Sequence, residues 1–209
     1  MTETTKPLRA DAERNRRLLL DAAAAAFAEH GLEVGVGEIA RRAGVGRGTV
    51  FRRFPTKEHL IAAVVVDRMH QASGRGRELL SDPDPGAALF ELLAAMVEAA
   101  RTDRALFEAV DDEFLANEDI SEAHADLVGV IDQLLRRAQE TGAVRDDVGG
   151  LDLLMMFKGV CEASRPFNDP AIAGRQLELV RAALRPVGDG ERLPGKPPTL
   201  DDMERARGG

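Results

Sequence analysis

The segment Gly35–Phe54, GVGEIARRAGVGRGTVFRRF, constrains the fold of this chain more than any other stretch. Its pattern is a short helix, a glycine turn and a second short helix. Ala40 is small and lets the two helices approach closely, and Gly44 supplies the positive φ that a tight turn needs. Val45 and Val50 then point back to pack against the helices that precede them. The segment is therefore predicted to be a helix-turn-helix.

The rest of the chain is also predicted to be helical. Apolar residues recur with helical spacing at Leu18, Leu19, Ala22, Ala26 and Phe27, and no long stretch alternates with a period of two. The sequence predicts an all-α fold of about nine helices. They cover residues 14–29, 36–43, 46–54, 56–73, 87–100, 102–116, 121–140, 148–163 and 170–184.

The positions of the breaks between these helices predict two domains and a C-terminal tail. An N-terminal three-helix DNA-binding domain is expected over residues 12–72, with its helix-turn-helix at 35–54, and a larger helical domain over 73–186. The run Ser73-Gly74-Arg75-Gly76 is interpreted as the end or a kink of the helix that begins near Thr56. Residues 187–209 are rich in Gly, Pro and charge and are predicted to be a mobile tail.

Charge is distributed unevenly along the chain. The net charge is −8, but residues 1–70 carry 12 Lys and Arg against 9 Asp and Glu, whereas the remainder carries 16 against 27. Between Arg41 and Lys57 there are six cations and no acid. A basic segment attached to an acidic body is typical of a docking face for nucleic acid.

The helical period indicates which side chains of the second short helix face the DNA. With Val50 and Phe54 directed inward, Arg47 lies at the start of the helix and is placed to contact a guanine edge. Thr49 is suited to a phosphate or a thymine methyl, and Arg53 and Lys57 to phosphates. The full set of predicted DNA-binding residues is Arg42, Gly46, Arg47, Gly48, Thr49, Phe51, Arg52, Arg53 and Lys57.

Several short motifs together resemble the DNA-binding domain of TetR-family transcriptional regulators. They are Phe27-Ala28-Glu29-His30-Gly31, Ile39-Ala40, Ala43-Gly44-Val45, Gly48-Thr49-Val50-Phe51 and Phe54-Pro55-Thr56-Lys57-Glu58-His59-Leu60. The match covers about residues 13–69, and the remaining helices are similar to the family's second domain in length and layout. The resemblance implies a homodimer, an operator with two half-sites, and an effector that weakens DNA binding.

The motif departs from the family pattern at three positions. Gly35 and Gly46 stand where a Ser or Thr usually caps the second and third helices, and Phe51 stands where Tyr is frequent. Replacing a side-chain cap by Gly costs only a few tenths of a kcal/mol. Phe51 has no hydroxyl for a phosphate, so Arg52, Arg53 and Lys57 are expected to bind the backbone instead.

The second domain offers candidates for an effector pocket and for a dimer interface. Large adaptable apolar residues are proposed to line the pocket, although such residues also serve as ordinary core. They are Phe90, Met96, Phe107, Phe114, Met155 and Phe157. The helix near residues 151–163 is apolar on more than one side, so packing on a partner subunit is expected, with core packing alone as the alternative. The interface candidates are Leu154, Met155, Lys158, Gly159 and Cys161.

The expected function is a sequence-specific repressor, released from its operator by a small hydrophobic or amphipathic effector. One alternative is an enzyme in the acidic body, with Asp111, Glu113 and His124 as its candidates, but no nucleophile–base pair accompanies them. The other alternative is a nucleic-acid-binding protein without sequence preference. No cofactor or metal is expected, since the four His lack ligand spacing and Cys161 is the only Cys. The lack of a signal peptide or a membrane span predicts a cytoplasmic protein, associated with the nucleoid when bound to DNA.

Overall fold

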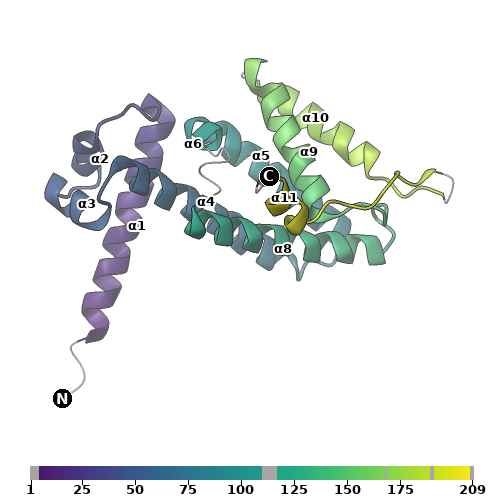
Figure 1. The fold of residues 1–209 in the computed structure, drawn as a ribbon, viewed down its shortest axis with the longest axis horizontal. Helices are drawn as coiled ribbons and strands as arrows, with labels where there is room; N and C mark the ends of the chain where they lie inside the picture. The colour runs from purple at the N-terminus through teal and green to yellow at the C-terminus, as the bar shows by residue number, and fades with distance from the viewer. Residues whose placement is uncertain (1–4, 110–116, 168, 189–190, 208–209) are drawn as a thin grey trace. The chain divides into compact units, whose positions relative to one another are not determined.

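The computed structural model describes residues 5–109, 117–167, 169–188 and 191–207. Within these ranges all regular structure is helical, which confirms the all-α fold. The helices are α1 (Thr5–His30), α2 (Val36–Arg42), α3 (Arg47–Arg53), α4 (Lys57–Leu79), α5 (Pro85–Thr102), α6 (Arg104–Ala109), α8 (Glu118–Glu140), α9 (Gly150–Ser164), α10 (Pro170–Ala183) and α11 (Leu200–Arg207), with a short 3₁₀ turn at Arg165–Phe167 (Figure 1).

The chain divides into two compact units. The first takes the chain up to Arg68 together with the segment Asp103–Ile120, and the second takes Met69–Thr102 and the chain from Ser121 onward. The boundary therefore falls within α4. The matching boundary expected from the sequence stays a prediction.

The first unit is built on α1, which contacts α2 and α6. Leu20, Ala23 and Phe27 of α1 are buried, and the residue that follows the helix is Gly31, whose φ is +70°. Leu18, expected on the buried face, is 52% exposed, because the apolar face of α1 is centred on Leu19 and Leu20.

Helix α4 continues through the glycines that were expected to end or kink it. Gly76 lies inside the helix, and a Cβ built on it would stand 2.4 Å from Val130 Cγ1 and 3.2 Å from Leu92 Cδ2. This glycine therefore serves close packing of α4 against α5 and α8 and does not terminate the helix. The contact with α8 involves residues more than fifty positions away, so local sequence rules do not reveal it.

The second unit is a bundle in which α5, α8, α9 and α10 share one apolar core. Leu89 and Leu92 of α5, Ile131 and Leu134 of α8 and Leu153 of α9 are all buried in it. Helices α9 and α10 lie side by side and both contact α5 (Figure 1). A second small cluster joins the same helices through Val97, Val160 and Ala173.

The turn between α8 and α9 is held by a nearly buried ion pair. The Arg145 guanidinium donates to both carboxylate oxygens of Asp147, at 2.5 and 2.9 Å, and this contact holds the pKa of Asp147 well below its usual range. Arg145 also donates from its backbone amide to the carbonyl of Leu184 at the end of α10. The pair therefore ties the turn to the last helix of the bundle.

The C-terminal segment is attached to the same turn. The Leu193 amide donates to Asp147 at 2.6 Å, and a Cβ placed on Gly149 would lie 2.9 Å from Pro197. Helix α11 then begins at Leu200, with Thr199 and Asp202 exchanging hydrogen bonds at its start. The Gly- and Pro-rich composition did not predict this helix.

Candidate nucleic-acid interface

Helices α2 and α3 form the predicted helix-turn-helix, and their buried residues are those expected. Ile39 and Val50 are at most 1% exposed and Phe54 is 8% exposed, so the second short helix is anchored on its inner side. Gly44 in the turn has a φ of +68°, and Gly35 and Gly46 stand as N-caps without side-chain hydrogen bonds. The opposite side of α3 faces solvent with Arg47, Gly48, Thr49, Phe51, Arg52 and Arg53.

Arg41 and Arg42 of this region are held in ion pairs. Arg41 donates to Glu38 at 2.7 and 2.8 Å, and Arg42 donates to Glu38 at 2.8 Å and to Glu29 at 2.6 Å. Hydrogen bonds from Arg41 and then Arg42 lower the pKa of Glu38 to about 2, and Arg42 also lowers the pKa of Glu29. Arg42 further contacts His30 Nε2 at 2.9 Å. These contacts give Arg42 a role in joining α2 to the end of α1.

This pairing was not predicted from the sequence because both acids lie outside the acid-free window. Glu38 precedes that window by three residues and is readable as an i, i+3 and i, i+4 partner on one helix. Glu29 is thirteen residues from Arg42 and comes close only through the folding of α1 against α2. Glu38 is therefore recognisable from spacing as a partner of Arg41 and Arg42, whereas the pairing of Glu29 with Arg42 depends on the tertiary structure.

The cations that project from α3 are in a different situation. Among the described residues, Arg47 and Arg52 make no ion pair or hydrogen bond and are exposed to solvent. Lys57 is half-buried at the start of α4, beside Glu58. The unpaired positive charge of the helix-turn-helix is thus concentrated on α3, whose side chains are suited to contacts with an anionic partner.

The start of α4 is organised by Thr56. Its hydroxyl accepts a 3.4 Å hydrogen bond from the His59 amide and lies 2.9 Å from His59 Nδ1. Hydrogen bonding from Thr56 also lowers the pKa of Glu58. Thr56 therefore caps the helix as expected and fixes the position of Lys57 next to it.

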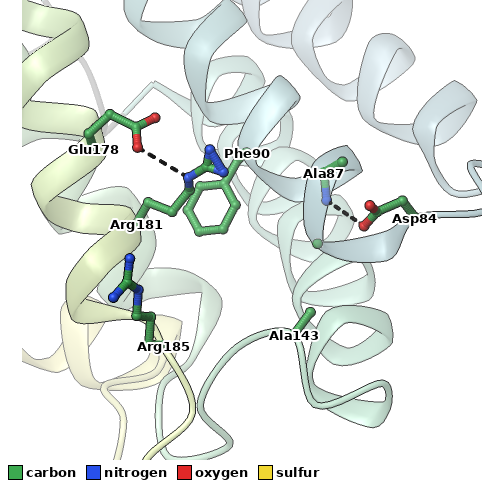
Figure 2. A pocket seen from close by; sticks show the side chains of 8 residues that line it. Asp84, Ala87, Phe90, Ala143, Glu178, Arg181 and Arg185 are labelled. Atoms are coloured by element: carbon green, nitrogen blue, oxygen red, sulfur yellow. Dashed lines mark hydrogen bonds and ion pairs between the residues drawn. The ribbon is translucent and has the colours of Figure 1, made fainter.

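The second unit carries an open groove at the start of α5 and the end of α10. It has a volume of about 510 Å³ and is lined by Asp84, Gly86, Ala87, Phe90, Ala143, Glu178, Arg181 and Arg185. Figure 2 shows Arg181 directed over the Phe90 ring, with its guanidinium carbon 5.5 Å from the ring centroid. Charges of both signs line the groove, so it does not have the apolar character expected of the effector pocket.

Of the candidate pocket residues that the structure describes in the second unit, Phe90, Met96 and Phe157 share the apolar core, and only Phe90 also lines the groove. Phe90 lines the groove, Met96 is buried in the core of the bundle, and Met155 is 62% exposed. Phe157 packs against both apolar clusters. Phe107 lies in the first unit, and Phe114 is outside the described residues, as are Asp111 and Glu113.

The candidate interface residues on α9 separate into two groups. Met155, Lys158 and Gly159 are exposed, whereas Leu154 packs against the core of the bundle and Cys161 is half-buried. Burial, and to a smaller extent Glu162, raises the pKa of the Cys161 thiol to about 12. Leu179 on α10 is 53% exposed and was not singled out from the sequence.

The described residues contain no group of three His, Cys, Asp or Glu side chains that could hold a metal ion. No helix among them is both long enough and apolar enough to cross a bilayer.

A helix-turn-helix with exposed arginines on its second helix, joined to a separate helical bundle, defines the class of helix-turn-helix DNA-binding regulators. Residues 19–64 match the family model described as "Bacterial regulatory proteins, tetR family". Residues 84–186 match the model described as "Transcriptional regulator SbtR-like, C-terminal domain". The chain belongs to the TetR family of bacterial transcriptional regulators.

Relatives cover most of the chain. The transcriptional repressor KstR of Rhodococcus jostii is 30% identical over 195 residues, which is 88% of each protein. The crystal structure of a TetR regulator from Mycobacterium vanbaalenii is 36% identical, covers 86% of this chain and 99% of its own, and superposes with a TM-score of 0.67. FadR of Bacillus subtilis, solved with stearoyl-CoA, shares the fold with a TM-score of 0.63 at 18% identity, over 81% of this chain and 100% of its own.

The relatives and the family models are transcriptional regulators and not enzymes. The chain is therefore a DNA-binding transcriptional regulator, and the enzyme alternative is set aside.

Proposed function

We propose that this chain is a homodimeric repressor that reads an operator with α3 and leaves it when a small molecule binds the second unit. The observation that carries the proposal is the contrast between paired and unpaired arginines. Arg41 and Arg42 are neutralised by Glu38 and Glu29, whereas Arg47 and Arg52 project from α3 without an acidic partner. Free guanidinium groups on the second helix of this motif are suited to base edges and phosphates.

The proposed contacts follow from position on the helix. Arg47 and Thr49 lie near the start of α3, where recognition helices contact base edges in the major groove. Arg52, Arg53 and Lys57 bind the phosphate backbone. Gly46, Gly48 and Phe51 form the remaining surface of α3 against the duplex. Arg42 acts indirectly, by holding α2 against α1.

A second copy of the chain is proposed to cover the outer face of α9 and α10. Met155 and Leu179 are large apolar side chains that are more than half exposed on these neighbouring helices. Gly159 on the same helix as Met155 leaves open space, which permits close helix approach. In a symmetric contact of this kind, Met155 and Leu179 of both copies are buried. Lys158 and Cys161 lie at its border, and Leu154 belongs to the core behind it.

The effector is proposed to be hydrophobic or amphipathic and to bind in the second unit. Support comes from the helical domain that this chain shares with ligand-binding relatives, one of which was solved with stearoyl-CoA. Two of the candidate pocket residues support this location. Phe90 lines the groove, and Phe157 packs against both apolar clusters. As a regulator of chromosomal genes, the protein is proposed to act in the cytoplasm, bound to the nucleoid while it represses.

The decisive experiment is selection of bound duplexes from a genomic DNA library, repeated at two salt concentrations. One inverted repeat, with half-sites about a helical turn or more apart, is the expected result. Recovery of unrelated sequences that are lost steeply with salt would overturn the proposal in favour of binding without sequence preference. The dimer is tested separately by sedimentation of Met155→Glu and Leu179→Glu variants, which are expected to be monomeric and folded.

A further inference from the structure

Gly37 lies inside α2, and the side chain of Arg47 lies across it. A Cβ built on Gly37 would have three nearest heavy atoms, and all three belong to Arg47: Cδ at 3.5 Å, Nε at 3.7 Å and Cζ at 3.9 Å. The end of the Arg47 side chain therefore rests on the bare backbone of α2. Arg47 is the first residue of α3, so this contact joins the two helices of the motif.

Nothing else in the surroundings of Gly37 calls for glycine. Its φ is outside the left-handed range, unlike that of Gly44, so its backbone conformation is open to any residue. Glycine also weakens a helix interior relative to alanine, which makes it an unfavourable choice on stability grounds alone. A side chain longer than a methyl group at this position would enter the space that Arg47 occupies.

The contact has a consequence for recognition. A long arginine side chain loses rotamer freedom when it is fixed on a base pair, and this loss weakens binding. A side chain that already rests on α2 has lost part of that freedom before DNA arrives, which is preorganisation. Its guanidinium also approaches the duplex from a defined direction.

We propose that Gly37 is a positioning residue for Arg47, which sets the direction of that guanidinium and thereby the base-pair preference of α3. This inference rests on the proposed function, in which Arg47 contacts a base edge. It assigns to α2 a part in sequence choice through a residue that has no side chain of its own.

The first test uses the free protein and does not depend on DNA. Nitrogen relaxation of the arginine Nε–H groups compares Arg47 with Arg52, which is exposed and has no partner in the described structure. Arg47 is expected to be the more ordered of the two, and Gly37→Leu is expected to abolish the difference. Equal mobility of the two arginines in the unsubstituted protein would overturn the inference.

The second test measures base preference by duplex selection. Gly37→Leu is expected to lower the preference at the base pair that Arg47→Ala also affects, by about tenfold, and to leave the other positions unchanged. Gly37→Ala is expected to retain the preference, since a Cβ at 3.5 Å from Arg47 is an ordinary van der Waals contact. Gly37→Gln serves as a second large variant, and thermal unfolding confirms that each variant is folded.

A double substitution separates positioning from direct effects. In the Arg47→Ala background, Gly37→Leu is expected to cause no further change in preference. A loss that persists in that background, or one that is uniform over all sequences, would mean that residue 37 contacts DNA itself and would overturn the inference. If the unsubstituted protein selects no operator although Arg47 is ordered, the proposed function fails while the positioning by Gly37 stands.

Discussion

The Asp132 carboxylate on α8 accepts a 2.7 Å hydrogen bond from the amide of Gly150, the first residue of α9. A Cβ on Gly150 would stand 2.4 Å from that Oδ1 atom. The close approach is possible only because residue 150 is glycine, and it satisfies an amide that the helix itself leaves without a partner.

Gly150→Ala is expected to destabilise the protein by about 1–3 kcal/mol, because the added methyl group pushes Asp132 away from the amide. The measurement is equilibrium unfolding in urea. Gly129→Ala is the control, since Gly129 lies within α8 with nothing near its Cβ position. Alanine there is expected to be neutral or to stabilise by up to about 1 kcal/mol. Equal effects of the two substitutions would show that the contact with Asp132 is unimportant.

Removing the acid that pairs with Arg41 and Arg42 is expected to strengthen DNA binding without regard to sequence. Glu38→Gln leaves the two guanidinium groups less neutralised beside the proposed DNA-facing surface. Affinity for operator and random duplexes is expected to rise together, with a salt dependence steeper by about one unit in log–log slope for each new phosphate contact. Fluorescence anisotropy at several salt concentrations measures both quantities. A change confined to the operator would contradict this account.

The lowered pKa of Glu38 predicts that the effect of Glu38→Gln on stability depends on pH. The folded-state pKa of Glu38 is lowered from 4.5 to about 2, chiefly by the hydrogen bond from Arg41. A lowered pKa contributes stability that is present above pH 4.5 and is lost as the pH falls toward 2. The difference in unfolding free energy between the unsubstituted protein and Glu38→Gln is therefore expected to be constant above pH 5 and to shrink below it. If the difference in unfolding free energy grew as the pH fell, the lowered pKa of Glu38 would be contradicted.

Residue spacing within one short segment was sufficient to predict the helix-turn-helix from the sequence. The burial of Val50 and Phe54 and the positive φ of Gly44 follow from spacing and backbone chemistry within one short segment. The placement of Arg42 does not follow from such rules, because its partner Glu29 lies thirteen residues away on another helix. The predicted role of Arg42 as a DNA contact was based on charge alone, and its neutralisation required the tertiary structure.

The chain beyond the helix-turn-helix contains the features that the sequence predicted less well. The glycines of α4 were interpreted as helix breakers, since a glycine that ends a helix and one that permits close packing look the same in one sequence. The six candidate pocket residues were chosen by type, and type does not distinguish the buried Met96 from the exposed Met155. Helix α11 follows a run of Gly and Pro whose composition is typical of a mobile chain.

The packing of α4 gives a further stability prediction. Gly76→Ala is expected to destabilise the bundle by about 1–3 kcal/mol, because the β-branched Val130 cannot move its Cγ1 away from a Cβ at 2.4 Å without a shift of α8. Gly74→Ala, two residues earlier in the same helix with open space around it, is expected to be neutral or stabilising. Urea unfolding of the two variants decides between packing and helix propensity. A stabilised Gly76→Ala variant would show that propensity dominates.

Cys161 is expected to be unreactive in the folded protein. Burial raises the pKa of its thiol to about 12, so only about one molecule in ten thousand carries the reactive thiolate at pH 8. Labelling by Ellman's reagent is therefore expected to be slow in the native state, to accelerate about tenfold for each pH unit up to pH 10, and to become fast in guanidinium chloride. Cys161→Ser, which is expected to give no signal, provides the blank. A labelling rate that levels off near pH 8.5 would identify an exposed thiol with an ordinary pKa and would contradict the effect of burial on Cys161.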